Sequence, residues 1–203
     1  MLLLISSGTG PEECGWVVFH LLEKLKDEAL TVDATISVIE AIKGVEGTYR
    51  SALLSVEGND DWCRSLLGTI QWIGTSKFRP HHKRKNWFVS ISLVPEPSLL
   101  PEMDERFLTF TAMRASGPGG QHINKVSSAV RVVHNTLGLM ATSQEERSQH
   151  LNKKSAIAKL TRMIFEQNQS KLSDAEKVKW NYHNTLERGN AVRVYYGDKF
   201  ERR

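Results

Sequence analysis

The chain has 203 residues, a formal net charge of +4, 40% hydrophobic residues and 25% charged residues. These values are typical of a globular protein with one large or two small domains, and no apolar run approaches the ~20 residues that a membrane helix needs. Residues 1–5 are apolar but follow no basic segment, so they predict a strand rather than a signal peptide. The two cysteines fit a reducing, cytoplasmic location and do not indicate a disulfide framework.

The charge is unevenly distributed along the chain. Residues 114–203 contain 16 Lys and Arg against 8 Asp and Glu, whereas residues 1–113 contain 11 against 15. A basic surface attracts polyanions because each neutralised phosphate releases a counterion. A merely soluble surface can also be basic, so the asymmetry favours a nucleic-acid partner without deciding the matter.

The first half of the chain predicts a mixture of strands and helices. Apolar or β-branched runs predict strands at residues 2–5, 31–41, 48–56, 69–73 and 87–94. Helical spacing predicts a helix over 16–25, and a short helix over 59–67 capped by Asn59 or Asp60. The glycine pattern before the first helix is similar to a dinucleotide-binding start, but Glu13 stands at its third glycine position and would repel a pyrophosphate.

The second half begins after a linker marked by Pro95 and Pro97. Strands are predicted at residues 107–112, 126–134, 139–142 and 191–196. Residues 148–186 are helical in composition and predict two helices broken near 170–174. We expect the last strand to return to the sheet of the first half, because a single strand needs a partner.

The segment from Arg114 to Asn124 reads Arg-Ala-Ser-Gly-Pro-Gly-Gly-Gln-His-Ile-Asn. Its glycines and proline cannot continue a helix or a central strand, and the glycines allow a bare backbone to approach another molecule closely. Gln121 follows them with side-chain donors and acceptors. Three other interpretations stay open: Ser116 beside His122 as a nucleophile without a third partner, a Gly-x-x-Gly loop that grips a nucleic-acid backbone, and a purely structural turn.

The Gly-Gly-Gln loop resembles that of the class I peptide chain release factors. The similarity also covers residues 101–134 and the stretch Gln144–His150 with Asn152 and Lys153, and it is weaker over 188–203. The resemblance implies ribosome-dependent hydrolysis of the peptidyl-tRNA ester in the A site, with the ribosome, ribosomal RNA and peptidyl-tRNA as partners. It also implies a glutamine methyltransferase that modifies the loop glutamine. The implied catalytic residues are Gly119, Gly120 and Gln121, and the implied tRNA- or rRNA-binding residues are Arg114, Ser116, Asn124 and Lys125.

Such a loop has to act without a strong base or nucleophile. The sequence holds no His-Glu-x-x-His metal pattern, no phosphate-binding Gly-x-x-x-x-Gly-Lys-Ser/Thr loop and no Gly-x-Ser-x-Gly elbow, so we expect no metal and no cofactor. Ester hydrolysis permits a positioned water and a backbone N–H that meets the developing oxyanion. We assign this N–H to Gln121, whose side chain would line the pocket, and the family implies that the terminal ribose hydroxyl of the tRNA shares in proton transfer.

The codon-reading element of the family is a Pro-x-Thr or Ser-Pro-Phe tripeptide between two strands. Ser76 and Phe78 echo the second form, but Lys77 replaces its central proline, which puts stop-codon reading in doubt. A basic stretch follows, in which clustered cations suit phosphate contacts and Trp87 suits either stacking or packing; a solvated hairpin tip would look the same. The predicted decoding-centre contacts are Ser76, Lys77, Phe78, His81, His82, Lys83, Arg84 and Lys85.

Short bacterial members of the family share the Gly8–Trp16 start and the Lys83–Trp87 loop. This resemblance implies rescue of stalled ribosomes, including ribosomes with a damaged decoding centre, alongside a functionally linked RNA ligase. We expect an α+β fold of two domains: residues 1–100 with 166–203 as a decoding-side domain that binds the small subunit, and 101–165 as the peptidyl-tRNA hydrolase domain. The alternatives are a non-catalytic ribosome- or RNA-binding factor and a truncated release factor that depends on stop codons.

Overall fold

The computed structural model describes residues 1–115 and 127–202, and the chain divides into two compact units. Unit 1 comprises Met1–Glu96 together with the chain from Ala175 onward, and unit 2 comprises Pro97–Asp174. The boundaries expected from the sequence, at 100/101 and 165/166, differ from these divisions by four and nine residues. Each unit combines helix with a largely antiparallel sheet, so the α+β fold class is confirmed.

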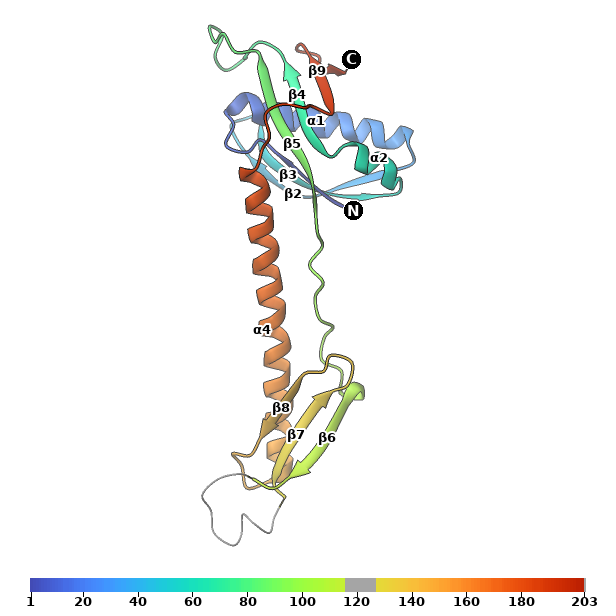
Figure 1. Cartoon of the computed structure of the whole chain (residues 1–203), viewed down its shortest axis with the longest axis vertical. Helices are drawn as coiled ribbons and strands as arrows, with labels where there is room; N and C mark the ends of the chain where they lie inside the picture. Colours follow the sequence, from blue (N-terminus) through green and yellow to red (C-terminus); the bar gives the residue numbers. More distant parts are fainter. Residues whose placement is uncertain (116–126, 203) are drawn as a thin grey trace. The chain divides into compact units, whose positions relative to one another are not determined.

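Unit 1 is built on a seven-stranded sheet with the strand order β10-β9-β4-β5-β1-β3-β2 (Figure 1). The strands are β1 (Leu2–Ser6), β2 (Thr35–Lys43), β3 (Tyr49–Glu57), β4 (Gly68–Ile73), β5 (Asn86–Val94), β9 (Arg193–Tyr196) and β10 (Glu201–Arg202). The apolar run of β1 is buried between β3 and β5, and it pairs antiparallel with both. β9 pairs parallel with β4, so the chain returns to this sheet as the sequence predicted.

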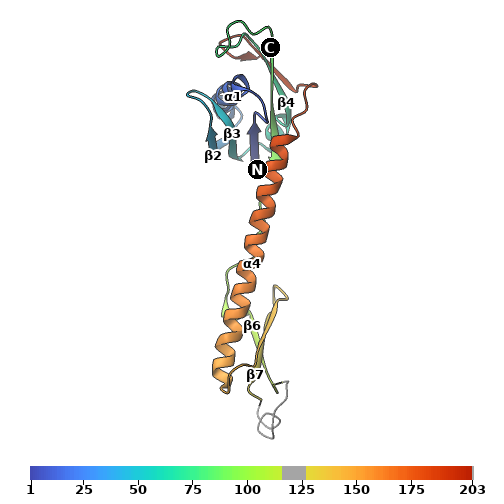
Figure 2. The same ribbon diagram turned by 90° about the vertical axis from the view of Figure 1, so that its left-hand side faces the viewer.

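The helix α1 (Glu12–Thr31) covers one face of this sheet (Figure 2). It packs against β3 and β5 through side chains that include the fully buried Val17, Leu21 and Leu25. Burial of each such side chain stabilises the fold by ~1.5–3 kcal/mol. The short helix α2 (Asp60–Ser65) begins where the sequence predicted, because the side chain of Asn59 accepts a hydrogen bond of 2.9 Å from the backbone N–H of Trp62.

Unit 2 contains a three-stranded antiparallel sheet with the order β6-β7-β8. Its elements are the 3-10 turn η1 (Glu105–Phe107), β6 (Leu108–Met113), β7 (Ala129–His134), β8 (Met140–Ser143) and the first part of the helix α4 (Gln149–Asn184). The core lies between sheet and helix, where Val132, Ala141, Ala156 and Leu160 are buried. The side chain of Asn168 on α4 also binds both main-chain groups of Leu100, at 2.7 Å to the nitrogen and 3.1 Å to the oxygen.

The predicted helix break near residues 170–174 is wrong, because α4 is one helix over Gln149–Asn184. Ser170 and Asp174 suggested the break, yet the segment holds neither glycine nor proline. Serine and aspartate cost a helix only roughly 0.5 kcal/mol relative to alanine, which tertiary contacts offset. One such contact is the hydrogen bond of 2.7 Å from the Lys171 ammonium to the carbonyl of Ser98.

Candidate functional site

The glycine-rich segment joins β6 to β7 and so connects the two strands of a hairpin. Met113 and Ala129 form the last strand pair before the loop. Arg114 follows β6 directly and its side chain is exposed. The other loop residues that we predicted to act lie outside the described residues, and these are Ser116, Gly119, Gly120, Gln121, Asn124 and Lys125.

Asn152 fastens the chain that leaves this loop. Its side chain is fully buried, and its amide nitrogen donates to the carbonyls of Ser128 and Glu146 at 2.8 Å each. Its amide oxygen accepts from the backbone N–H of Glu146 at 3.0 Å and from the Ser143 hydroxyl at 3.3 Å. One side chain of α4 therefore joins the end of β8, the turn before α4 and the exit of the loop. This gives a physical role to the Asn-Lys pair that the sequence singled out.

A carboxylate–lysine pair supports the same turn. The Glu145 carboxylate accepts hydrogen bonds from the ammonium of Lys159 and from the Ser143 hydroxyl. These bonds, that of Lys159 first, lower the pKa of Glu145 to about 2. The pair is solvent-exposed, so its net contribution to stability is small.

A shallow hollow lies beside the loop end of the hairpin in unit 2. It is lined by Phe110, Ala112, Val130, Gln149, His150 and Lys153. The Lys153 ammonium stands 4.2 Å from the centre of the Phe110 ring. The surface next to the glycine loop therefore combines an aromatic ring with cationic and amide groups, which suits contact with RNA.

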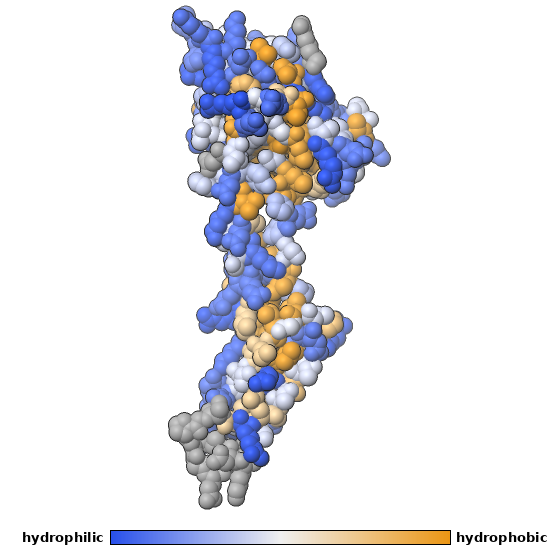
Figure 3. Space-filling model, in the orientation of Figure 1, coloured by the Kyte–Doolittle hydropathy of each residue, from blue (hydrophilic) through white to orange (hydrophobic). Residues whose placement is uncertain are grey.

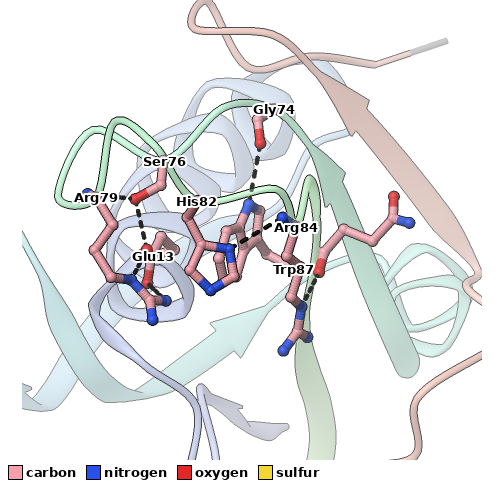
Figure 4. A network of polar contacts seen from close by, with 8 residues as sticks. Glu13, Gly74, Ser76, Arg79, His82, Arg84 and Trp87 are labelled. Atoms are coloured by element: carbon pink, nitrogen blue, oxygen red, sulfur yellow. Dashed lines mark hydrogen bonds and ion pairs between the residues drawn. The ribbon is translucent and has the colours of Figure 1, made fainter.

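The second candidate region is the β4–β5 loop, defined here as residues 74–85. Its two ends are joined by a hydrogen bond of 2.9 Å from the Gly74 nitrogen to the Lys85 carbonyl. The position requires glycine, because an added Cβ would lie 2.2 Å from the Trp72 ring. The indole of Trp87 donates to the Gly74 carbonyl at 3.1 Å, which fixes the start of the loop against β5 (Figure 4).

Glu13 holds the middle of the β4–β5 loop (Figure 4). Its side chain is 1% exposed, and it accepts from the Ser76 hydroxyl at 2.5 Å and from Arg79 Nε and Nη2 at 2.8 Å each. The Ser76 hydroxyl in turn accepts from the backbone N–H of Arg79 at 2.8 Å. Burial raises the pKa of Glu13, but the hydrogen bonds from Arg79 and Ser76 outweigh it, so the pKa lies below its ordinary value. The carboxylate is therefore ionised at neutral pH.

Trp87 packs inside unit 1 and is fully buried, which decides between the two roles that the sequence allowed. The guanidinium groups of Arg79 and Arg84 lie 5.6 and 5.0 Å from its ring centre. Arg84 Nε also donates to the Asn86 carbonyl at 2.8 Å, and its backbone N–H donates to His82 Nδ1 at 3.0 Å. Arg84 and His82 are thus held against the base of the loop.

The eight predicted decoding-side residues therefore differ in how they are placed. Ser76 is buried, whereas His82 and Arg84 are half-buried and engaged within the loop. The exposed side chains are those of Lys77, Phe78, His81, Lys83 and Lys85. In Figure 3, hydrophilic residues cover the end of unit 1 that bears this loop.

Two important residues of this region escaped the sequence analysis. Glu13 entered it only as an obstacle to a dinucleotide motif, and Arg79 was not selected at all. They are 66 residues apart, so no local pattern joins them. An acidic residue that the helix buries, opposite an arginine in a loop of cations, becomes visible only when the fold is known.

Comparison with known proteins identifies the class. The protein family described as "RF-1 domain" matches residues 98–202. The chain belongs to the class I peptide chain release factor family. It is 39% identical over 203 residues to the peptide chain release factor homolog of Escherichia coli (strain ATCC 25922), and the match covers 98% of both proteins. This similarity confirms the expected resemblance to the short bacterial members of the family. Family membership supports a peptide release factor role in translation termination.

Longer relatives match over part of their length. Peptide chain release factor 2 of Buchnera aphidicola is 31% identical over 195 residues, which are 94% of this chain and 53% of that protein. Among solved structures, RF2 of Thermus thermophilus aligns with a TM-score of 0.46 and 28% identity, over 96% of this chain and 57% of that one. The chain thus spans about half the length of the release factor 2 proteins that it matches.

Within residues 1–115 and 127–202, no helix has the length and apolar character needed to cross a membrane. The same residues contain no group of three or more His, Cys, Asp or Glu that could hold a metal ion.

Proposed function

We propose that this protein hydrolyses the peptidyl-tRNA ester in the ribosomal A site and so releases the nascent peptide. The observation that carries the proposal is the Gly-Gly-Gln sequence at residues 119–121, in the segment that joins β6 to β7 inside the RF-1 match. Family membership implies ribosome-dependent hydrolysis in general. In this proposal, unit 2 supplies the chemistry and unit 1 binds the small subunit at the decoding side.

The chemistry assigned to the loop is positioning and electrostatic stabilisation. The backbone N–H of Gln121 would donate to the oxyanion that forms as water attacks the ester carbonyl. The side chain of Gln121 would line the pocket, and Gly119 and Gly120 would let the backbone approach the tRNA end. Arg114, Ser116, Asn124 and Lys125 are proposed to contact tRNA or rRNA around the reacting ester.

We further propose that the protein rescues stalled ribosomes rather than ending translation at stop codons. Lys77 stands where the family tripeptide has proline, and the Ser76 hydroxyl donates to Glu13 while accepting from the Arg79 backbone. Because the Ser76 hydroxyl is already engaged within the protein, it supports the proposal that the loop does not use this group to read bases. The echo of Ser-x-Phe favours the alternative, a stop-codon-dependent factor. A non-catalytic ribosome-binding factor is the third candidate.

The partners in this proposal are the ribosome, ribosomal RNA and peptidyl-tRNA, and the proposed site of action is the cytoplasm. Methylation of Gln121 by a glutamine methyltransferase and a functional link to an RNA ligase remain predictions from the family resemblance. A damaged decoding centre as the preferred substrate is likewise a prediction.

The deciding experiment measures release of labelled peptide from ribosomes that hold peptidyl-tRNA, with stop, sense or empty A sites, and with intact or nicked small subunits. We expect release without a stop codon, and faster release from nicked ribosomes if the decoding-side loop recognises damage. Release confined to stop codons would favour the truncated termination factor. Binding without release on any of these ribosomes would favour the non-catalytic factor.

A further inference from the structure

We propose that Glu13 is a positioning residue that fixes the β4–β5 loop, so that Lys77, His81, Lys83 and Lys85 form a preshaped surface for ribosomal RNA phosphates. The inference rests on the proposed function, since it names the surface through which unit 1 binds RNA. It adds a residue outside the loop, and it separates the side chains that are left for RNA from the two arginines that hold the loop in place.

Glu13 buries a charged side chain in the first turn of α1. A carboxylate that is 1% exposed loses its hydration and needs several strong hydrogen bonds in return. Glu13 obtains them from the Arg79 guanidinium, which binds through two parallel N–H groups, and from the Ser76 hydroxyl. All of these partners belong to the β4–β5 loop, so the carboxylate of the helix orders the loop directly.

The basic side chains of the β4–β5 loop fall into two groups, those that contact the rest of unit 1 and those that are exposed. Arg79 binds Glu13 and lies against Trp87, and Arg84 lies near the same ring while it donates to the Asn86 carbonyl. These two arginines are thus engaged by the protein itself. Lys77, His81, Lys83 and Lys85 are exposed. The Lys77 ammonium lies 4.9 Å from the centre of the Trp16 ring on α1. The hydrogen bonds inside the loop therefore leave three lysines and one histidine on its outer side.

A β4–β5 loop that is ordered before it meets RNA should bind RNA more tightly. Lysine and histidine side chains on an unstructured loop would have to lose backbone freedom on contact with RNA, and this entropy would weaken the complex. A loop that is already held by a buried carboxylate avoids that loss. Phosphates of an RNA backbone suit the three lysines and the histidine N–H groups because such contacts need charge and donors at fixed spacings rather than recognition of a base.

Glu13→Gln tests the proposal, with Glu12→Gln as the matched control. Glu12 is the adjacent residue and carries the same charge, but its carboxylate accepts from the Thr48 hydroxyl at 3.1 Å and contacts no residue of the β4–β5 loop in the described hydrogen bonds. Hydrogen exchange of the free protein should accelerate in residues 74–87 of Glu13→Gln and stay unchanged elsewhere in unit 1. Glu12→Gln should match the wild type over residues 74–87.

Ribosome titrations then separate positioning from chemistry. Glu13→Gln should raise the ribosome concentration for half-maximal peptide release about tenfold, equivalent to ~1.4 kcal/mol, and leave the rate at saturation within about twofold. Because Glu13 itself contacts no phosphate in this proposal, the salt dependence of binding should keep its slope. Arg79→Lys should act in the same direction, since lysine cannot bind both carboxylate oxygens through a planar fork.

Three results would overturn the inference: wild-type exchange and affinity in Glu13→Gln, faster exchange throughout unit 1, or a reduced salt slope. The second would make Glu13 a general structural residue, and the third would make it part of the RNA contact. If the wild-type protein released no peptide from any ribosome, the proposed function would fail. Exchange and co-sedimentation with ribosomes would still decide the role of Glu13.

Discussion

The Asn152 amide donates to the carbonyl of Ser128 at 2.8 Å, which joins the first turn of α4 to the chain leaving the glycine-rich loop. Ser128 directly precedes β7, whose first residue, Ala129, pairs with Met113 on β6. The loop end of the hairpin is therefore held by strand pairing and by a buried side chain. In the proposed function, in which the loop positions water, its precise placement depends on both.

Asn152→Ala should destabilise unit 2 and slow peptide release. The substitution leaves the carbonyls of Ser128 and Glu146 and the Glu146 N–H without their side-chain partner. One buried polar group without a partner costs about 1–3 kcal/mol. Hydrogen exchange should accelerate around residues 128 and 146, and the rate of release at saturating ribosomes should fall. Thr161→Ala, which removes an exposed hydroxyl from α4, should change neither.

Gly120→Ala should abolish hydrolysis while the protein still binds ribosomes. An added Cβ would restrict the backbone that is proposed to approach the ester, and loss of one oxyanion donor costs on the order of 10²–10³ in rate. Single-turnover release and co-sedimentation measure the two properties separately. Thr111→Ala, at an exposed position on β6, is the matched control. Unimpaired release by Gly120→Ala would refute the assignment of the loop.

Local pattern was enough to predict most elements of this fold. The strands at 2–5 and 69–73 and the Asn59 cap are confirmed because apolar runs and a side-chain cap act within a few residues. The break in α4 was predicted wrongly, since Ser and Asp only weaken a helix and contacts such as that of Asn168 with Leu100 support it. The two-residue strand β10 carries too little pattern to be recognised.

The candidate sites also differ in whether local sequence or tertiary contacts define them. The Gly-Gly-Gln loop could be proposed as a site from the sequence because its motif is one contiguous segment. The grip of Glu13 on Ser76 and Arg79 could not, because the partners are 63 and 66 residues away. The sequence also allowed Trp87 to stack on RNA, and only the fold reveals that its ring is buried. Residues that position a site depend on tertiary structure more than residues that perform its chemistry.

Replacing Lys83 and Lys85 together with alanine should weaken ribosome binding and flatten its salt dependence. Both side chains are exposed on the β4–β5 loop, and each phosphate contact that is lost reduces the slope of log K against log salt by ~0.7–0.9. Binding measured across a series of salt concentrations gives this slope. Lys24→Ala with Lys199→Ala removes the same charge from exposed positions of unit 1 outside the loop and should leave the slope unchanged. An equal loss in both double variants would indicate a general charge effect.

Acid should destabilise unit 1 through Glu13. Its pKa is lowered in the folded protein from the ordinary value of 4.5, because the hydrogen bonds from Arg79 and Ser76 outweigh burial. A lowered pKa means that the stabilisation is complete above ~4.5 and is lost as pH falls through the folded-state pKa. All five tryptophans lie in unit 1, so their fluorescence during denaturant unfolding reports on this unit. Below about pH 4.5, the wild-type free energy of unfolding should fall more steeply than that of Glu13→Gln. Parallel curves for wild type and Glu13→Gln would mean that the Glu13 carboxylate has the same pKa in the folded and unfolded chains, and would remove the electrostatic basis for its hold on the loop.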